Sequence, residues 1–549
     1  MLERLGFRIE PTVFFVSAGL ILASVAAIAI VPEEAASMLQ AVQAWIASNL
    51  GWFYILIVSL FLIFVAGLGA SRFGNVRLGA DDEEPEFTTL GWFSMLFSAG
   101  MGIGLLYNGV GEPLTHYTSP PTAEPQTLAA AEEALLFTFY HWGFHPWAIY
   151  SVVGLSIAYF GFRRNMPISL RSAFYPLLGE RVNGPIGHAI DIFAVLGTMY
   201  GVAASLAIGA KQISAGLNEV FGITPNFATQ GTVIAVITLV ATVSLISGLN
   251  KGIRRLSEGN LMLSGALLVF IFIAGPTVYM LDSFVANLGF YVEIILQTGF
   301  WTDPYDQAGQ WQESWTIGYW GWWLAWAPFV GMFIARISRG RTIREFVLAV
   351  LLVPTVVSFF WFSIAGDTAI QLVRQGNQAL VDTLGQENGL DVIFFTFLES
   401  FPLAEVTSVV VIVAVFVFFV TSSDSGSFVI DMLTSGGHAN PPVAQKIFWA
   451  FTEGAVAAVM ILAGGLPAVR ALVAAAGLPC AILLACMCWA LLRALREERA
   501  LITAVEMAAA EAHVAEHGYE PPADEDAPQR EDARSSGGAS GVLRPGPAE

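Results

Sequence analysis

Five tryptophans lie within twelve residues at the start of one apolar stretch, Trp315 to Arg341, and they are the side chains best suited to chemistry. They are Trp315, Trp320, Trp322, Trp323 and Trp326. The face of an indole ring attracts a cation, including a cation that cannot donate hydrogen bonds. An aromatic belt at the membrane interface is the alternative, but a belt places only one or two such residues at each end of a span. The spacing therefore favours a site for an onium cation.

Two other apolar runs are interrupted by residues that loosen a helix or offer oxygen ligands. The first is SAGMGIGLLYNGVGEP (98–113), which is rich in glycine, and the second is VTSSDSGS (420–427), which carries hydroxyls and Asp424. Unwound backbone at membrane depth is tolerated only where it lines a cavity or is covered by protein. We therefore expect both spans to be broken. Close helix packing by glycine and helix capping by the Ser/Asp cluster remain alternatives.

Signs of enzymatic chemistry are weak. His141 and His145 are spaced by one helical turn, but no third ligand is evident, so hydrogen bonding between helices is favoured over a metal site. The three cysteines, Cys480, Cys486 and Cys488, fall in one late apolar run and indicate neither a disulfide framework nor a metal site. No nucleophile–base pair accompanies them, which argues against a membrane-embedded enzyme.

The composition is that of a polytopic membrane protein. The 549 residues have a mean hydropathy of +0.65 and are only 13% charged. The net charge of −19 argues against a nucleic-acid partner. About 20 apolar residues are needed for each span, and this measure predicts twelve transmembrane helices. They cover residues 13–31, 51–70, 90–111, 134–160, 189–218, 232–248, 260–281, 315–337, 344–366, 402–432, 446–464 and 466–492.

The order of the spans predicts an internal repeat. Helices 3–7 and 8–12 form two units of five spans with opposite orientations, the five-plus-five inverted repeat of many secondary transporters, preceded by two extra helices. The clustering of Arg and Lys in alternate loops places both termini in the cytoplasm. The chain is therefore predicted to have five parts. They are an N-terminal segment with helices 1–2 (1–89), the first repeat unit (90–281), an outer amphipathic segment with its loop (282–314), the second repeat unit (315–492) and a tail (493–549). The tail is helix-prone up to His517 and then acidic, with a composition typical of disorder.

Four motifs in this order resemble the betaine/carnitine/choline transporter family, in particular its sodium-coupled, glycine-betaine-type members. They are SAGMGIG (98–104), HWGFHPWAIY (141–150), the tryptophan-rich stretch and VTSSDSGS. The resemblance covers nearly all of spans 3–12. It implies an all-α, LeuT-like fold, an inner-membrane location, alternating access, a homotrimer and no cofactor other than Na⁺ as coupling ion.

The resemblance also implies a substrate site and gates. An aromatic box would hold the onium group, with further residues along the pathway and in the unwound part of helix 3. The box residues are Trp142, Trp147, Tyr150 and Trp323; the further residues are Trp322, Trp326, Gly100, Met101, Gly102 and Gly104; the gating aromatics are Tyr107 and Phe333.

A sodium site is implied between helices 3 and 10. Its ligands would be Ser98, Met101, Phe418, Thr421 and Ser422. The resemblance also bears on the coupling ion. Sodium-independent and proton-coupled members of the family carry a charged residue at the positions of Met262 and Gly104, respectively, and both residues are neutral here, which favours sodium coupling. A second sodium site of the family would use Thr198 and Phe329, but Val202 replaces its second hydroxyl, so two sodium ions per cycle are in doubt.

The sequence thus predicts a sodium symporter that imports glycine betaine, dimethylsulfoniopropionate, ectoine or a similar compatible solute for osmoprotection. The alternatives are a sodium-independent exchanger of carnitine- or betaine-like solutes and a proton-coupled choline importer. From other classes, a membrane enzyme or an osmosensor without transport is disfavoured.

Overall fold

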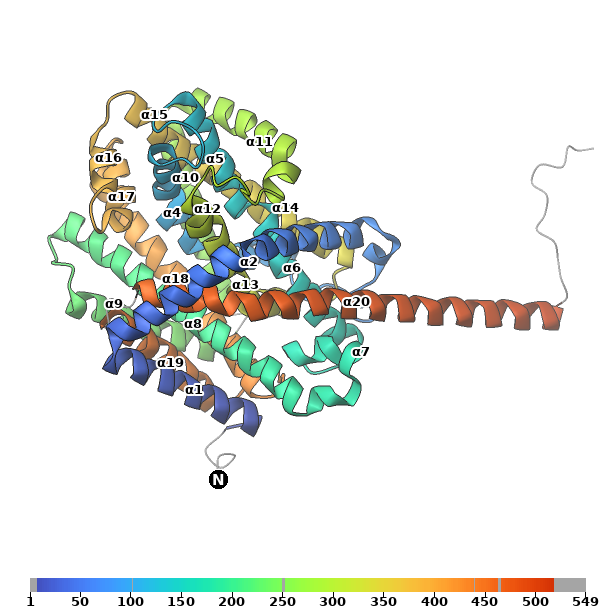
Figure 1. Ribbon diagram of the computed structural model, residues 1–549. Coiled ribbons are helices and arrows are strands. Elements are labelled where there is room, and N and C mark those ends of the chain that lie inside the picture. Colours follow the sequence, from blue (N-terminus) through green and yellow to red (C-terminus); the bar gives the residue numbers. More distant parts are fainter. Residues whose placement is uncertain (1–6, 101, 249–251, 439, 463–465, 518–549) are drawn as a thin grey trace, which may run out of the picture. The chain divides into compact units, whose positions relative to one another are not determined.

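The computed structural model describes residues 7–100, 102–248, 252–438, 440–462 and 466–517 (Figure 1). Within these ranges the chain is all-helical, and its one β-bridge pairs Arg77 with Thr342. Nine helices of the described part are long and apolar enough to cross a membrane. This confirms an all-α, multi-pass membrane protein, while the count of twelve and the inverted repeat stay predictions. The chain divides into two compact units, Met1–Ala494 and Leu495–Glu549.

The apolar runs predicted the bounds of the first helix well and those of the second poorly. Helix α1 covers Pro11–Ile30 and matches its predicted span. Helix α2 covers Pro32–Ala70, so the predicted start at residue 51 is wrong by almost twenty residues. A proline in the first turn and Glu33 and Glu34 beside it are favourable at a helix N-terminus, and they start the helix well before its apolar part.

Helices α3 (Thr89–Gly100) and α4 (Gly102–Thr118) cover the third predicted span on either side of Met101, which lies outside the described residues, so the expected break in this span stays a prediction. The fourth predicted span is made of two helices. Helices α5 (Leu128–Trp142) and α6 (Phe144–Ala158) meet at Gly143, a break the sequence did not predict. A Cβ atom at Gly143 would lie 2.5 Å from both the Phe139 carbonyl and the Tyr291 hydroxyl, so the close approach there requires glycine.

The next helices follow the predicted order with one shifted boundary. They are α8 (Pro185–Phe221), α9 (Phe227–Ser247), α10 (Ile253–Ala274) and α11 (Thr277–Gly299). The predicted span 260–281 runs across the break at Gly275 and Pro276, where α10 ends. The amphipathic segment is a separate helix, α11. Short segments between α6 and α8 are η3 (Tyr159–Arg163), η4 (Leu170–Phe174), α7 (Tyr175–Leu178) and η5 (Gly179–Asn183), and η2 (Arg72–Asn75) follows α2.

The tryptophan-rich stretch forms the centre of the larger unit. Its π-helical start η6 (Glu313–Ile317) follows α12 (Gln310–Gln312) and leads into α13 (Gly318–Ile337). Helix α13 packs along α6 and α8, and its side chains are almost all buried. Next come α14 (Ile343–Phe362), the π-helical η7 (Ser363–Asp367), α15 (Thr368–Arg374), α16 (Ala379–Leu384) and α17 (Gly389–Leu398). Helices α16 and α17 were not predicted, because a run of ten residues is too short to span.

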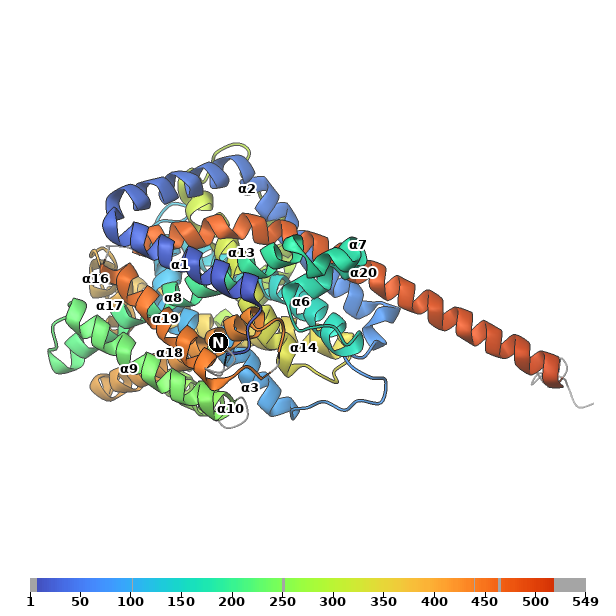
Figure 2. The same ribbon diagram turned by 90° about the horizontal axis from the view of Figure 1, so that it is seen from below.

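Helix α18 (Ala404–Thr434) is continuous, which contradicts the predicted break at Thr421 to Ser427. The polar side chains find partners without unwinding the backbone. The Thr421 hydroxyl donates to the Phe418 carbonyl at 2.9 Å, Asp424 accepts from Ser244 of α9, and Ser427 donates to Glu453 at 2.9 Å. Asp424 therefore lies mid-helix and caps no helix end. Helix α18 packs against α8, α9 and α19 (Val443–Leu462), which lie side by side in Figure 2.

The last helix, α20, covers Leu466–His517 and joins the predicted twelfth span to the helix-prone part of the tail. The helix is described as far as His517, so the predicted end of the helix-prone stretch stays a prediction. The acidic residues 518–549, predicted to be disordered, lie outside the described part of the chain.

Arginines that the sequence placed on one membrane side gather around the loop at 81–86. Three of them form ion pairs with acidic residues of this loop, which joins α2 to α3 and packs against the α13–α14 turn. The pairs are Arg163–Asp81 at 2.8 Å, Arg336–Glu86 at 2.7 Å, and Arg339–Glu83. That this side faces the cytoplasm stays a prediction.

Candidate functional site

Four predicted box residues form one connected aromatic cluster. The rings of Trp142 (the last residue of α5) and Trp323 (α13) lie 5.1 Å apart at 75°. Tyr150 of α6 lies 6.3 Å from Trp323, and Trp147 lies 5.5 Å from Tyr150. All four are buried, with at most 5% of their surface exposed. The structure thus brings together residues from both halves of the predicted fourth span and from α13.

The cluster extends in both directions along α13. Tyr319, which was not among the predicted site residues, stacks on Trp323 at 5.5 Å and lies 5.8 Å from Trp142. On the other side, Trp322 lies 6.0 Å from Trp323 and 6.3 Å from Trp326. Two turns of one helix therefore supply a continuous row of ring faces.

Several polar atoms of this cluster have no internal partner. The Nε1 atoms of Trp147, Trp322 and Trp326 and the hydroxyl of Tyr150 are buried without a hydrogen bond to any described residue. Buried donors are paired in most folded proteins. Four unpaired donors around one cluster are therefore available to a polar ligand.

Gly104 sets how closely α4 approaches the cluster. A Cβ atom at this position would lie 2.0 Å from Cη2 of Trp142, so the indole packs directly on the glycine backbone. Gly100 and Gly102 are the described helical residues on either side of Met101. Met101 between them lies outside the described residues, so its predicted substrate and sodium contacts stay predictions.

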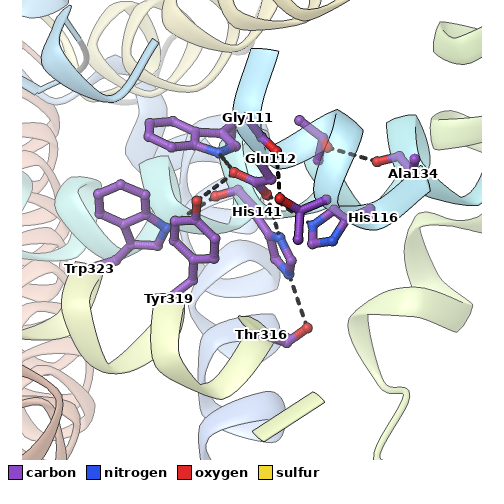
Figure 3. Close-up of polar contacts among 11 residues, drawn as sticks. Gly111, Glu112, His116, Ala134, His141, Thr316, Tyr319 and Trp323 are labelled. Atoms are coloured by element: carbon purple, nitrogen blue, oxygen red, sulfur yellow. Dashed lines mark hydrogen bonds and ion pairs between the residues drawn. The ribbon is translucent and has the colours of Figure 1, made fainter. Parts of the chain in front are cut away.

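A fully buried carboxylate, Glu112 of α4, holds the cluster from one side (Figure 3). Its Oε2 accepts hydrogen bonds from Nε1 of Trp142 at 2.7 Å and from the hydroxyl of Tyr319. Its Oε1 lies 2.8 Å from Nδ1 of His141. Glu112 was not among the predicted site residues, although an ionisable residue within a predicted span is itself a signal of function.

The two histidines of the HWGFH motif have different surroundings. His141 bonds Glu112 of α4 and, through Nε2, the Thr316 hydroxyl of η6 at 3.0 Å, which confirms for this histidine the hydrogen bonding between helices that was predicted for both. Its backbone carbonyl also accepts from Nε1 of Trp323 at 3.1 Å. His145 instead packs against the rings of Tyr140 and Trp320, so the pair does not converge on one site.

The predicted gating residues lie on different helices. The Tyr107 hydroxyl donates to Oδ1 of Asp391 at 3.1 Å, and this carboxylate comes from α17, which the sequence did not predict. Phe333 is fully buried in α13. Their gating roles stay predictions.

The described part of the predicted sodium site lies on α18. Phe418, Thr421 and Ser422 are at most 3% exposed. The Phe418 carbonyl and the Thr421 hydroxyl, two predicted ligands, are hydrogen-bonded to each other at 2.9 Å. Helix α18 packs against α3 and α4, as a site shared with Ser98 and Met101 requires. The side chain of Ser98 lies outside the described residues.

The predicted second sodium site has only part of its hydroxyl set. The Thr198 hydroxyl is buried without a partner among the described residues, and Phe329 is fully buried. Val202, one turn after Thr198, packs on α18: a Cβ atom at Gly426 would lie 2.7 Å from its Cγ2. An apolar side chain thus lies one turn from the Thr198 hydroxyl, and a sodium site there stays a prediction.

Met262, a neutral residue that favours sodium coupling in the sequence, does not face the interior of the helix bundle. Met262 of α10 is 70% exposed. On that helix Asn260 is buried, and neither polar atom of its side chain has a partner in the described structure. Because Asn260 is also neutral, this part of α10 still offers no cation in place of sodium.

Comparisons with known proteins agree on one family. The family described as "BCCT, betaine/carnitine/choline family transporter" matches residues 12–500. The "Glycine betaine transporter" of Acinetobacter baylyi is 41% identical over 91% of this chain and 76% of its own length. The "Glycine betaine transporter OpuD" of Bacillus subtilis is 44% identical over 90% of this chain and 96% of its own. "Glycine betaine transporter 1" of Vibrio parahaemolyticus is 42% identical over 90% and 96%.

Proposed function

Because this chain belongs to the betaine/carnitine/choline transporter family, we propose that it imports a betaine-like compatible solute by sodium symport with alternating access. It is a membrane transporter and not an enzyme. In this proposal it works in the inner membrane with both termini in the cytoplasm, as a homotrimer, and contributes to osmoprotection.

The observation that carries the proposal is the buried aromatic cluster around Trp142, Tyr150 and Trp323. Ring faces from α5, α6 and α13 meet there. A desolvated cation–π contact contributes about 2 kcal/mol, and a quaternary ammonium group suits such faces because it needs no hydrogen-bond acceptor.

The unpaired donors of the same cluster match the other end of a zwitterion. The Nε1 atoms of Trp147, Trp322 and Trp326 donate to no described group. A carboxylate offers acceptors for such donors, and hydrogen bonds to an ionised group are stronger than those between neutral groups. A solute with a methylated cation at one end and a carboxylate at the other uses both features.

Sodium coupling rests on the oxygen atoms of α18 and on neutral positions elsewhere. The Phe418 carbonyl and the hydroxyls of Thr421 and Ser422 are buried near α3 and α4, and hard cations prefer oxygen ligands. Gly104 and Asn260 supply no charge that replaces sodium. The resemblance of this chain to glycine betaine transporters adds to the argument on substrate.

The test of substrate is uptake into proteoliposomes. Labelled glycine betaine is offered under an inward sodium gradient, with choline, carnitine, dimethylsulfoniopropionate, ectoine or glycine as unlabelled competitors. Glycine is the matched control, since it is glycine betaine without its methyl groups. We expect competition by methylated onium carboxylates and none by glycine. Equal competition by glycine, or no uptake of glycine betaine, contradicts the proposed substrate class.

A further inference from the structure

Three potential metal ligands converge beside the aromatic cluster. They are Oε1 of Glu112 and Nε2 of His116, one turn apart on α4, and Nδ1 of His141 on α5 (Figure 3). Oε1 lies 2.8 Å from the His141 nitrogen and 3.4 Å from the His116 nitrogen. All three ligand atoms lie within 4.8 Å of one another, and all three side chains are fully buried.

These distances suit a small transition-metal ion. Zinc binds imidazole nitrogen and carboxylate oxygen at about 2.0–2.2 Å, which puts neighbouring ligand atoms of a tetrahedron about 3.3 Å apart. The observed separations lie on both sides of this value, so small side-chain adjustments place the three atoms around one ion. Two imidazoles and one carboxylate also form the ligand set of several zinc sites.

The surroundings of His116 are a second observation that points to a ligand. Its Nδ1 has no partner among the described residues, and the only polar contact of its Nε2 among them is Glu112 Oε1 at 3.4 Å, too loose for a hydrogen bond, although the side chain is fully buried. The rings of Trp311 and Trp315 pack against it at 4.9 and 4.5 Å. A buried imidazole with no close hydrogen bond is costly. An ion bound between Nε2 and the Glu112 oxygen would replace this loose 3.4 Å contact with two metal–ligand bonds.

The surroundings also fix the other ligands. Nε2 of His141 bonds the Thr316 hydroxyl at 3.0 Å, which leaves Nδ1 turned toward Glu112. An outer hydrogen bond of this kind orients metal-bound histidines. Oε2 of Glu112 is held by Trp142 and Tyr319, which leaves Oε1 for the histidines.

We propose that Glu112, His116 and His141 bind a divalent transition-metal ion of the Zn²⁺ class, and that the bound ion inhibits transport. The site is distinct from the predicted sodium sites, and it does not use His145, whose pairing with His141 was the metal site considered from the sequence. An ion bound there ties α4 to α5 and immobilises the carboxylate that holds Trp142. The inhibitory part rests on the proposed transport function, whereas the binding part does not.

Binding is tested on the full-length protein in lipid nanodiscs. Zn²⁺ is titrated by calorimetry after long equilibration, since the cluster is closed, and Co²⁺ binding is followed by its visible absorption bands. We expect one strong site in the parent protein. His116→Asn should weaken Zn²⁺ binding by about tenfold or more, and His116→Cys, which restores a ligand, should recover it.

The control is another histidine–carboxylate pair. His188 Nε2 lies 3.4 Å from Oε1 of Glu10, the same separation as in His116–Glu112, but this pair is part of no three-ligand cluster among the residues that the structure describes. His188→Asn should leave Zn²⁺ affinity unchanged. No binding in the parent protein, or equal affinity in parent and His116→Asn, overturns the site.

Inhibition is then measured separately by uptake with and without Zn²⁺. We expect Zn²⁺ to slow uptake by the parent protein and to have little effect on His116→Asn. Zinc binding without any effect on uptake overturns the inhibitory part alone. If no solute is taken up under any condition, the proposed function fails while the binding result stands.

Discussion

Nε1 of Trp142 donates a 2.7 Å hydrogen bond to Oε2 of Glu112, so a buried carboxylate on α4 fixes the orientation of an aromatic ring on α5. The Tyr319 hydroxyl of α13 donates to the same oxygen. Three helices that belong to two predicted repeat units are therefore tied at one atom. Any motion of α4 relative to α5 or α13 must therefore either break these hydrogen bonds or move Trp142 and Tyr319 together with Glu112.

Glu112→Gln should weaken substrate binding. The amide has one acceptor oxygen, so it cannot accept from Trp142 and Tyr319 and also pair with His141 as the carboxylate does. An unsatisfied buried donor costs about 1–3 kcal/mol. We expect a higher half-saturation concentration for glycine betaine uptake. Glu133→Gln is the control, because this carboxylate accepts from Thr122 at the loop before α5. Equal effects of the two substitutions would show that Glu112 has no special role in positioning.

Trp323→Leu should weaken binding by about 1–2 kcal/mol, or about 5–30-fold, because one cation–π face is lost. Trp52 of α2 is 57% exposed, so Trp52→Leu should have no effect. Affinity is measured by fluorescence titration of the purified protein with glycine betaine. An unaltered affinity in Trp323→Leu removes this ring from the site.

Gly104→Ala should displace Trp142, since the new Cβ atom would lie 2.0 Å from its Cη2. We expect a loss of glycine betaine binding with the fold retained, as judged by thermal unfolding. Gly259→Ala is the matched control, because no atom lies within 4 Å of the corresponding Cβ position. Normal binding by Gly104→Ala would mean that the contact between α4 and Trp142 is not needed.

Val202→Thr should create the missing part of the second sodium site. It places a hydroxyl one turn from Thr198 without changing side-chain shape. We expect uptake by the parent protein to depend on sodium with first-order steepness, and uptake by the variant to depend on it more steeply. Val195→Thr, also buried in α8, is the control. A parent protein that already shows the steep dependence contradicts the role given to Val202.

The features that could be predicted from the sequence are those that apolar runs and aromatic motifs determine. The order of the spans, the independent helix α11 and the convergence of Trp142, Tyr150 and Trp323 follow from residue types that are strongly constrained by the membrane. Hydropathy alone could not show the break at Gly143, because the need for glycine there depends in part on Tyr291, which is distant in sequence and whose hydroxyl would lie 2.5 Å from a Cβ atom at this position.

Polar residues within spans were predicted less well, because their partners come from other helices. Asp424 looked like a helix breaker, yet Ser244 of α9 satisfies it within an intact α18. Glu112 was overlooked within a glycine-rich motif, and only the fold shows that Trp142, Tyr319 and His141 meet at its carboxylate. The orientation of Met262 away from the interior likewise depends on how α10 packs.

The most direct test of the central claim is the ion dependence of accumulation in proteoliposomes. External sodium is replaced by potassium at fixed membrane potential and pH, and labelled glycine betaine inside the vesicles is measured over time. Sodium symport predicts accumulation above the external concentration with a sodium gradient and only equilibration without it. Accumulation that is unchanged in potassium would contradict sodium coupling and favour a sodium-independent exchanger or proton coupling.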